Sequence, residues 1–187
     1  MATTTKLTLD EFLARPETKP YSEYACGDVY QKPMPDADHS SAQEILWLLL
    51  RQFLAGSSIG HVHIEWRCVF GPPGIERAFV PDIAFASHER LAVRGRNQRK
   101  FVWTAPDLAV EVLSPDQPAG EFADKLQFYL LHGVRLVWVI DPVERTIRFY
   151  RPGEDARLLH MGDTLDGSDV LPRFSVSVDD IFAEIED

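Results

Sequence analysis

The order of hydrophobic and polar residues along the chain predicts an alternation of helices and strands. Thr8 suits the N-cap of a short helix, because Leu9, Phe12 and Leu13 recur at helical spacing. Residues 21–31 alternate loosely around a Gly-Asp turn, which predicts a hairpin. The chain therefore opens with a short helix and a hairpin.

The main pattern that follows has the order helix, strand, strand, strand, helix, strand. A capping box at residues 41–44 precedes a largely apolar helix that ends at Gly56. The other elements expected are strands at 61–70, 77–86, 108–113 and 136–140, a helix at 120–132, a hairpin partner at 147–150 and a C-terminal helix at 178–185. We predict a single α/β (α+β) domain over residues 1–187.

Composition and charge exclude several classes of protein but do not by themselves indicate a function. Of the 187 residues, 45% are hydrophobic and 26% are charged, which is typical of a globular domain and excludes a disordered chain. The formal net charge of −10 argues against a protein that coats nucleic acid by bulk attraction. Cys26 and Cys68 form no CxxC motif, and a reduced, cytoplasmic setting suits them. No apolar run is long enough to span a membrane, so we expect no membrane partner.

Two carboxylates stand out because each lies within an apolar stretch. Asp82 follows Pro81 in one expected strand, and Glu111 lies among aliphatic residues in the next. Burying a carboxylate costs free energy unless a partner compensates its charge. A shared divalent cation would serve both, since Mg²⁺ takes oxygen ligands; pairing with an arginine or capping of a turn would serve as well.

Lys125 follows Glu111 by 14 residues (125 − 111), in the expected helix 120–132. A strand-loop-helix return can bring its ammonium over the two carboxylates, where it would orient water or stabilise a charged phosphate transition state. An exposed lysine on a helix surface is the alternative.

Several ordered blocks resemble one nuclease family. They are Pro-Asp at 81–82, Glu-Val-Leu-Ser at 111–114, the helix-borne Lys125 and Trp-Val-Ile-Asp-Pro at 138–142. Together they resemble the Uma-type restriction endonuclease family of the PD-(D/E)XK nuclease superfamily. The resemblance runs from Thr8 to about Tyr150. It implies an αβββαβ core with a mixed central sheet flanked by helices, metal-dependent hydrolysis of DNA phosphodiester bonds, and homodimers.

The resemblance also assigns roles to individual residues. The family's Asp, Glu and Lys fall on Asp82, Glu111 and Lys125. Mg²⁺ or Mn²⁺ would be held by Asp82 and Glu111 with the carbonyl oxygen of Val112. Leu113 stands where the superfamily motif has lysine, so the family's lysine has moved to the helix.

Glu23 and His39 also match blocks of this family. Glu23 would add a third carboxylate or help to hold a second metal, and His39 would contact the scissile phosphate or act as a general base. Local hydrogen bonding at a helix N-terminus is the alternative for His39. Glu65, on the polar face of its strand, is expected to pair with a neighbour such as Arg67. His61 and His63 have a spacing also used for zinc, but with no third ligand evident they are expected to be solvated or paired within the sheet.

The charge is distributed unevenly along the chain. Residues 162–187 carry eight acids and one arginine, which predicts a solvated acidic C-terminal extension. Residues 90–100 contain five basic side chains and no acid, and we expect them to contact DNA phosphates. These five are Arg90, Arg94, Arg96, Arg99 and Lys100.

Two other functions remain open at this point. One is a catalytically inert protein that uses the nuclease fold to bind nucleic acid, which metal-binding calorimetry would distinguish. The other is a metal-dependent hydrolase of small phosphoesters, which would act on nitrophenyl phosphates and leave plasmid DNA intact.

Overall fold

The computed structural model describes residues 6–92, 101–115 and 119–185. In these ranges the helices are α1 (Leu9–Leu13), α2 (Ala37–Ala55), α3 (His88–Ala92), α4 (Ala119–Leu131) and α5 (Val178–Ile181). The strands are β1 (Ser22–Ala25), β2 (Asp28–Gln31), β3 (Gly60–Ile64), β4 (Cys68–Phe70), β5 (Arg77–Phe79), β6 (Ile83–Ser87), β7 (Leu108–Val112), β8 (Leu136–Asp141), β9 (Thr146–Tyr150), β10 (Arg157–Leu159), β11 (Thr164–Asp166) and β12 (Ser175–Ser177).

The central sheet has six strands in the order β10-β9-β8-β7-β6-β3. Strands β7 and β8 are parallel, and the other neighbours are antiparallel, so the sheet is mixed. Helix α4 connects the parallel pair, as a crossover between parallel strands requires. The succession α2, β3, β6, β7, α4, β8 confirms the αβββαβ order expected from the sequence.

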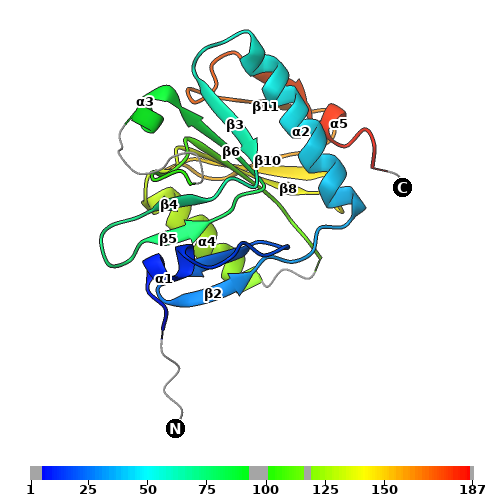
Figure 1. Ribbon diagram of the computed structural model, residues 1–187. Coiled ribbons are helices and arrows are strands. Elements are labelled where there is room, and N and C mark those ends of the chain that lie inside the picture. Colours follow the sequence, from blue (N-terminus) through cyan, green and yellow to red (C-terminus); the bar gives the residue numbers. More distant parts are fainter. Residues whose placement is uncertain (1–5, 93–100, 116–118, 186–187) are drawn as a thin grey trace.

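Helices cover both faces of this sheet (Figure 1). Helix α2 lies on one face and α4 on the other, where a smaller sheet of order β2-β1-β5-β4 also packs. Strand β7 illustrates how its sequence serves both layers. Leu108, Val110 and Val112 face the α2 side, while Ala109 belongs to the cluster on the α4 side. Because side chains alternate along a strand, Glu111 also faces α4.

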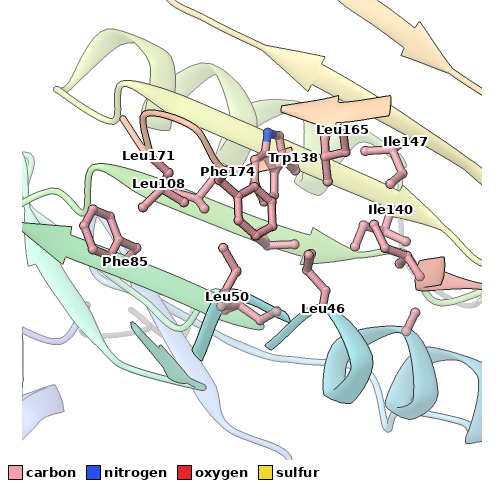
Figure 2. Close-up of a cluster of buried hydrophobic side chains, with 14 of the residues drawn as sticks. Leu46, Leu50, Phe85, Leu108, Trp138, Ile140, Ile147, Leu165, Leu171 and Phe174 are labelled. Atoms are coloured by element: carbon pink, nitrogen blue, oxygen red, sulfur yellow. The ribbon is translucent and has the colours of Figure 1, made fainter. Parts of the chain in front are cut away.

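The larger hydrophobic core lies between α2 and the central sheet (Figure 2). Leu46 and Leu50 of α2 are fully buried and approach the sheet face that carries Trp138. Phe174, from the C-terminal segment, stacks on the Trp138 ring at a centroid distance of 5.8 Å. The C-terminal segment is therefore part of this core, and its acidic residues lie outward while its apolar residues lie inward.

Local hydrogen bonds explain where the first two helices begin. Thr8 caps α1 in a capping box with Glu11, as expected. Helix α2 starts earlier than the predicted capping box at residues 41–44, so that prediction was wrong. Asp36 is the N-cap, because its carboxylate accepts a hydrogen bond from the amide of His39.

Two long strands expected from alternation are each divided in the structure. Residues 61–70 form β3 and β4, which belong to different sheets and are separated by Glu65 with a φ of 48°. Residues 77–86 likewise divide into β5 and β6 around Pro81, which has no N–H for a strand ladder. Asp82 therefore lies at the junction between the two sheets and not within a strand.

Candidate active site

A cavity of about 430 Å³ opens where the smaller sheet meets the central sheet. The hairpin β1–β2, the start of α2, the β5–β6 junction, β7 and α4 all contribute to its wall. Ionisable side chains on this wall that are mostly withdrawn from solvent are Glu23, Lys32, His39, Asp82, Glu111 and Lys125. All of them except Lys32 are catalytic candidates selected from the sequence. Tertiary folding therefore brings all five predicted catalytic residues to one cavity.

Asp82 is 3% exposed and is held on both carboxylate oxygens. Oδ2 accepts a hydrogen bond of 2.7 Å from the amide of Val112, which ties the sheet junction to β7. Oδ1 receives the Lys32 ammonium and lies 3.4 Å from Nε2 of His39. Burial alone would raise the pKa of Asp82, but Lys32 and His39 outweigh it and hold the pKa below its ordinary value.

Glu111 projects from β7 toward α4, where it meets two side chains of the helix. Its Oε1 accepts a hydrogen bond of 2.7 Å from the Tyr129 hydroxyl and lies 2.8 Å from Nζ of Lys125. Burial raises the pKa of Glu111 despite the opposing effect of the two nearby ammonium groups. Helix α4 thus orients the carboxylate, and burial makes its charged form less favourable.

Lys125 is 6% exposed, so the alternative of an exposed helix-surface lysine is excluded. Its Nζ lies 2.8 Å from Glu111 and 2.8 Å from Oε1 of Glu23. Burial favours the neutral amine, but the two carboxylates outweigh burial and raise the pKa of Lys125. Lys125 is therefore a buried cation held between a residue of the central sheet and a residue of the smaller one.

Glu23, in β1, links the two sheets at this cavity. The same Oε1 that receives Lys125 also accepts a hydrogen bond of 2.7 Å from the amide of Val80. Its carboxylate is thereby directed at Lys125 and at the backbone beside Asp82, and not at Asp82 itself.

His39 lies in the first turn of α2, and its ring bonds inward. Nδ1 lies 3.1 Å from the hydroxyl of Ser114, which follows β7, while Nε2 faces Asp82. The His39 amide also donates to the N-cap Asp36, so the local hydrogen bond expected at the helix N-terminus is present. Contact with a phosphate and general-base action stay predictions.

Lys32 is the site residue that the sequence analysis missed. It follows β2, and its side chain is 12% exposed although the residue lies in a proline-rich connection. Nζ donates to the carbonyl oxygen of Val80 at 2.9 Å and to Asp82. The sequence offers one weak signal: a lysine directly after a strand and before Pro33, in a short connection that has to cross the cavity.

The donor set fits a divalent cation of the hard, oxygen-binding type. Asp82 and Glu111 supply carboxylate oxygens beside the Lys32 ammonium, a cation that already occupies an oxygen-lined position. Mg²⁺ is commonly bound by one or two carboxylates, with waters completing its shell. Within the described ranges no three His, Cys, Asp or Glu side chains form a metal-binding group, so a site here would rest on two carboxylates.

Most of the basic residues at 90–100 lie outside the residues that the structure describes. Arg94, Arg96, Arg99 and Lys100 lie outside the described residues. Arg90 is described, and its guanidinium binds Asp107 at 3.0 Å and the carbonyl oxygens of Ala105 and Gly133 at 3.0 and 2.7 Å. These contacts favour a structural role for Arg90 over a contact with phosphate.

The remaining polar candidates lie apart from the site's centre. Glu65 pairs with Lys19 at 2.7 Å at the rim of the cavity. His61 and His63 are exposed on the edge strand β3, and their rings contact His88 and Trp66. Among the helices described, none is both long enough and apolar enough to cross a membrane.

Fold and cavity together define a nuclease-like protein, in which carboxylates and a lysine meet between a mixed central sheet and a smaller sheet, within an αβββαβ core. Comparison with known proteins gives the family. The family model described as "Uma2: Putative restriction endonuclease" matches residues 9–179, and the chain belongs to this family. No curated protein is similar enough to count as a relative.

A solved structure from Anabaena variabilis ATCC 29413, titled a "putative nuclease belonging to DUF820", is similar in both sequence and fold. It is 32% identical, with a TM-score of 0.82, and the alignment covers 95% of this chain and 98% of that one. The fold is therefore a nuclease fold, and family and neighbour both support a nuclease function.

Proposed function

We propose that this chain is a divalent-metal-dependent endonuclease that hydrolyses phosphodiester bonds in DNA. One observation carries the proposal: Asp82, Glu111 and Lys125 come from separate elements and meet at one cavity. Burying three ionisable groups together costs free energy, and such clusters concentrate at functional sites.

Asp82 and Glu111 are the residues that would hold Mg²⁺ or Mn²⁺, with the carbonyl oxygen of Val112 as a further ligand. When bound, the cation supplies a Lewis acid that polarises a phosphoryl oxygen and acidifies the attacking water. Tyr129 orients Glu111 through its hydroxyl, and the amide of Val112 orients Asp82. Both carboxylates are therefore pre-positioned by the folded chain.

Lys125 places a fixed positive charge beside the reacting phosphate. The phosphate gains negative charge as water attacks phosphorus, and a buried ammonium stabilises that charge without reorganisation. The bond to the 3′ oxygen then breaks, that oxygen takes a proton, and the product carries a 5′ phosphate. Glu23 holds the Lys125 ammonium in place from the opposite sheet. His39 lies near enough to Asp82 to orient the carboxylate or to exchange a proton.

The substrate preference is proposed from the family and from the basic segment. A pair of chains acting as a homodimer would present two cavities to the two strands of a duplex. The acidic average charge of the protein then implies few phosphate contacts and a shallow dependence of DNA binding on salt.

A supercoiled-plasmid assay tests the proposal. The wild-type protein should convert plasmid to nicked and linear forms with Mn²⁺ or Mg²⁺, and chelation with EDTA should stop the reaction. Asp82→Asn and Glu111→Gln should abolish cleavage while the circular-dichroism spectrum stays that of a folded protein. Cleavage that survives in a clean Asp82→Asn preparation would refute the assignment, and activity on nitrophenyl phosphate alone would point to a small phosphoester as substrate.

A further inference from the structure

Lys32 is a second, largely buried ammonium at the site, and the proposed hydrolysis gives it no part. It reaches the cavity from the end of the β1–β2 hairpin, 50 residues before Asp82 in the chain. Its Nζ contacts two oxygens, the Val80 carbonyl at 2.9 Å and Oδ1 of Asp82. A carbonyl and a carboxylate oxygen are also the ligands that a hard divalent cation takes.

The charges around Lys32 explain why it stays there. Burial opposes its charged form, but Asp82, Glu111 and Glu23 all favour it. Three carboxylates face two ammonium groups, Lys32 and Lys125, so the cluster is nearly balanced without a further cation. Removal of Lys32 would leave a buried excess of negative charge.

Both oxygens of Asp82 are already engaged. Oδ2 accepts from the Val112 amide, and Oδ1 holds Lys32 with His39 nearby. A divalent cation that binds Oδ1 of Asp82 has to replace the contact to Lys32, because two cations cannot share one oxygen at close range without strong repulsion.

We propose that Lys32 is a built-in competitor for the metal: its ammonium occupies the cation position beside Asp82, and metal binding requires it to move away. This inference rests on the proposed metal-dependent function. The backbone of Lys32 is anchored by a hydrogen bond of 2.9 Å from its amide to the carbonyl oxygen of Tyr21. The side chain beyond that anchor lines the cavity, and its four-carbon stem has the rotatable bonds needed to turn the ammonium away from Asp82 once a cation replaces it.

Calorimetric titration with Mn²⁺ measures the competition directly. Lys32→Gln removes the ammonium and should bind Mn²⁺ about tenfold more tightly than the wild type, or more, because a unit charge next to a ligand oxygen opposes the ion strongly. Lys32→Met serves as a second variant should glutamine fold poorly, as judged by thermal melting.

Lys19→Gln is the matched control. Lys19 lines the same cavity but is 66% exposed and pairs with Glu65, so its removal changes the formal charge equally without touching Asp82. Its effect on Mn²⁺ affinity should be several times smaller than that of Lys32→Gln. Equal effects of the two variants would overturn the inference, because they would show a general charge effect.

The outcomes separate this inference from the proposed function. Weaker or unchanged Mn²⁺ affinity in Lys32→Gln, with binding that Asp82→Asn abolishes, would overturn the role of Lys32 and leave the metal site intact. No Mn²⁺ binding in the wild type, Lys32→Gln or Lys32→Met would overturn both.

Lysine acetylation read by mass spectrometry gives a readout independent of affinity. Saturating Mn²⁺ should raise the acetylation of Lys32 severalfold, since displacement exposes its amine, and should leave Lys19 unchanged. Continued protection of Lys32 at saturating Mn²⁺ would contradict displacement.

Discussion

The ammonium of Lys125 lies 2.8 Å from Oε1 of Glu111, and the two residues belong to a strand and the helix that follows it. The crossover from β7 through α4 to β8 folds the helix back over the sheet, so one turn of α4 faces the carboxyl end of β7. Glu23 adds a third contact from the other sheet. The position of Lys125 is therefore specified by three elements at once.

Replacement of Lys125 tests whether this charge acts on the reaction. Lys125→Met should lower the rate of plasmid cleavage about 100-fold to 1000-fold, the usual effect of removing one electrostatic contact to a transition state. Calorimetry should show that Mn²⁺ still binds, because Asp82 and Glu111 remain. Lys6→Met makes the same chemical change at a side chain that is 64% exposed. The Lys6→Met protein should cleave plasmid at the wild-type rate. A Lys125→Met protein that cleaves at the wild-type rate would remove Lys125 from the mechanism.

The core between α2 and the central sheet makes a prediction about stability. Leu46 is fully buried, and Leu46→Ala should lower the free energy of unfolding by about 2–5 kcal/mol. Leu48 lies on the same helix but is 52% exposed, so Leu48→Ala should change it by about 0.5 kcal/mol or less. Urea unfolding followed by circular dichroism measures both. Similar losses in the two variants would contradict the placement of this helix face.

Asp107 is a buried carboxylate with a structural role. It is 1% exposed, and it binds the amide of Ser87 at 2.8 Å and the guanidinium groups of Arg90 and Arg135 at 3.0 and 3.3 Å. Asp107→Ala should lower the free energy of unfolding by about 2–3 kcal/mol. This loss is smaller than that for a fully buried ion pair, because Arg135 reaches water. Asp169→Ala, at a carboxylate that is 54% exposed, is the control and should cost under about 1 kcal/mol.

Arg90 separates folding from DNA binding. Because its guanidinium already binds Asp107 and two carbonyl oxygens, Arg90→Ala should lower the melting temperature. The salt dependence of DNA binding should stay the same, since no phosphate contact is lost. Fluorescence anisotropy with labelled DNA over a salt series measures the slope. A slope reduced by about one unit would place Arg90 on the phosphate backbone instead.

The two cysteines should differ in reactivity. Cys26 is exposed, whereas Cys68 is fully buried and burial raises the pKa of its thiol above the ordinary value of 9.0. Only the thiolate reacts, so iodoacetamide at about pH 8 should modify Cys26 alone in the folded protein. Mass spectrometry identifies the modified residue, and labelling of both in urea is the control.

The raised pKa of Cys68 also makes the stability of the protein depend on pH. Folding keeps the Cys68 thiol protonated, while the unfolded chain releases its proton near pH 9.0. The contribution of Cys68 is therefore complete below pH 9.0 and declines as the pH rises further. Cys68→Ser should weaken this alkaline loss of stability in urea titrations at several pH values.

Local patterns in the sequence predicted the parts of the fold that depend on neighbours in the chain. The Thr8 cap, the first hairpin, strand β7 and helix α4 were all expected near their observed bounds, because capping, turn residues and periodicity act within a few residues. The convergence of Asp82, Glu111 and Lys125 was predicted from the blocks shared with the family and from the order of the helices and strands.

Other features were decided by contacts between distant segments. Pro81 and Glu65 interrupt alternating stretches whose halves join different sheets, and alternation alone does not reveal which sheet a strand joins. The acidic C-terminal stretch hides an apolar side that covers the core. Arg90 pairs with Asp107, 17 residues away, a contact that the sequence did not predict.

Lys32 shows most clearly which features depend on tertiary packing and not on neighbouring residues in the sequence. Its sequence neighbours specify only a polar connection after a strand, which suits a solvated lysine. Its burial follows from the meeting of two sheets, because only there does Asp82 offer a charge large enough to outweigh the cost of removing an ammonium from water. The sequence by itself thus determined the order of elements and the identity of the catalytic candidates, while tertiary packing decided which charges face one another.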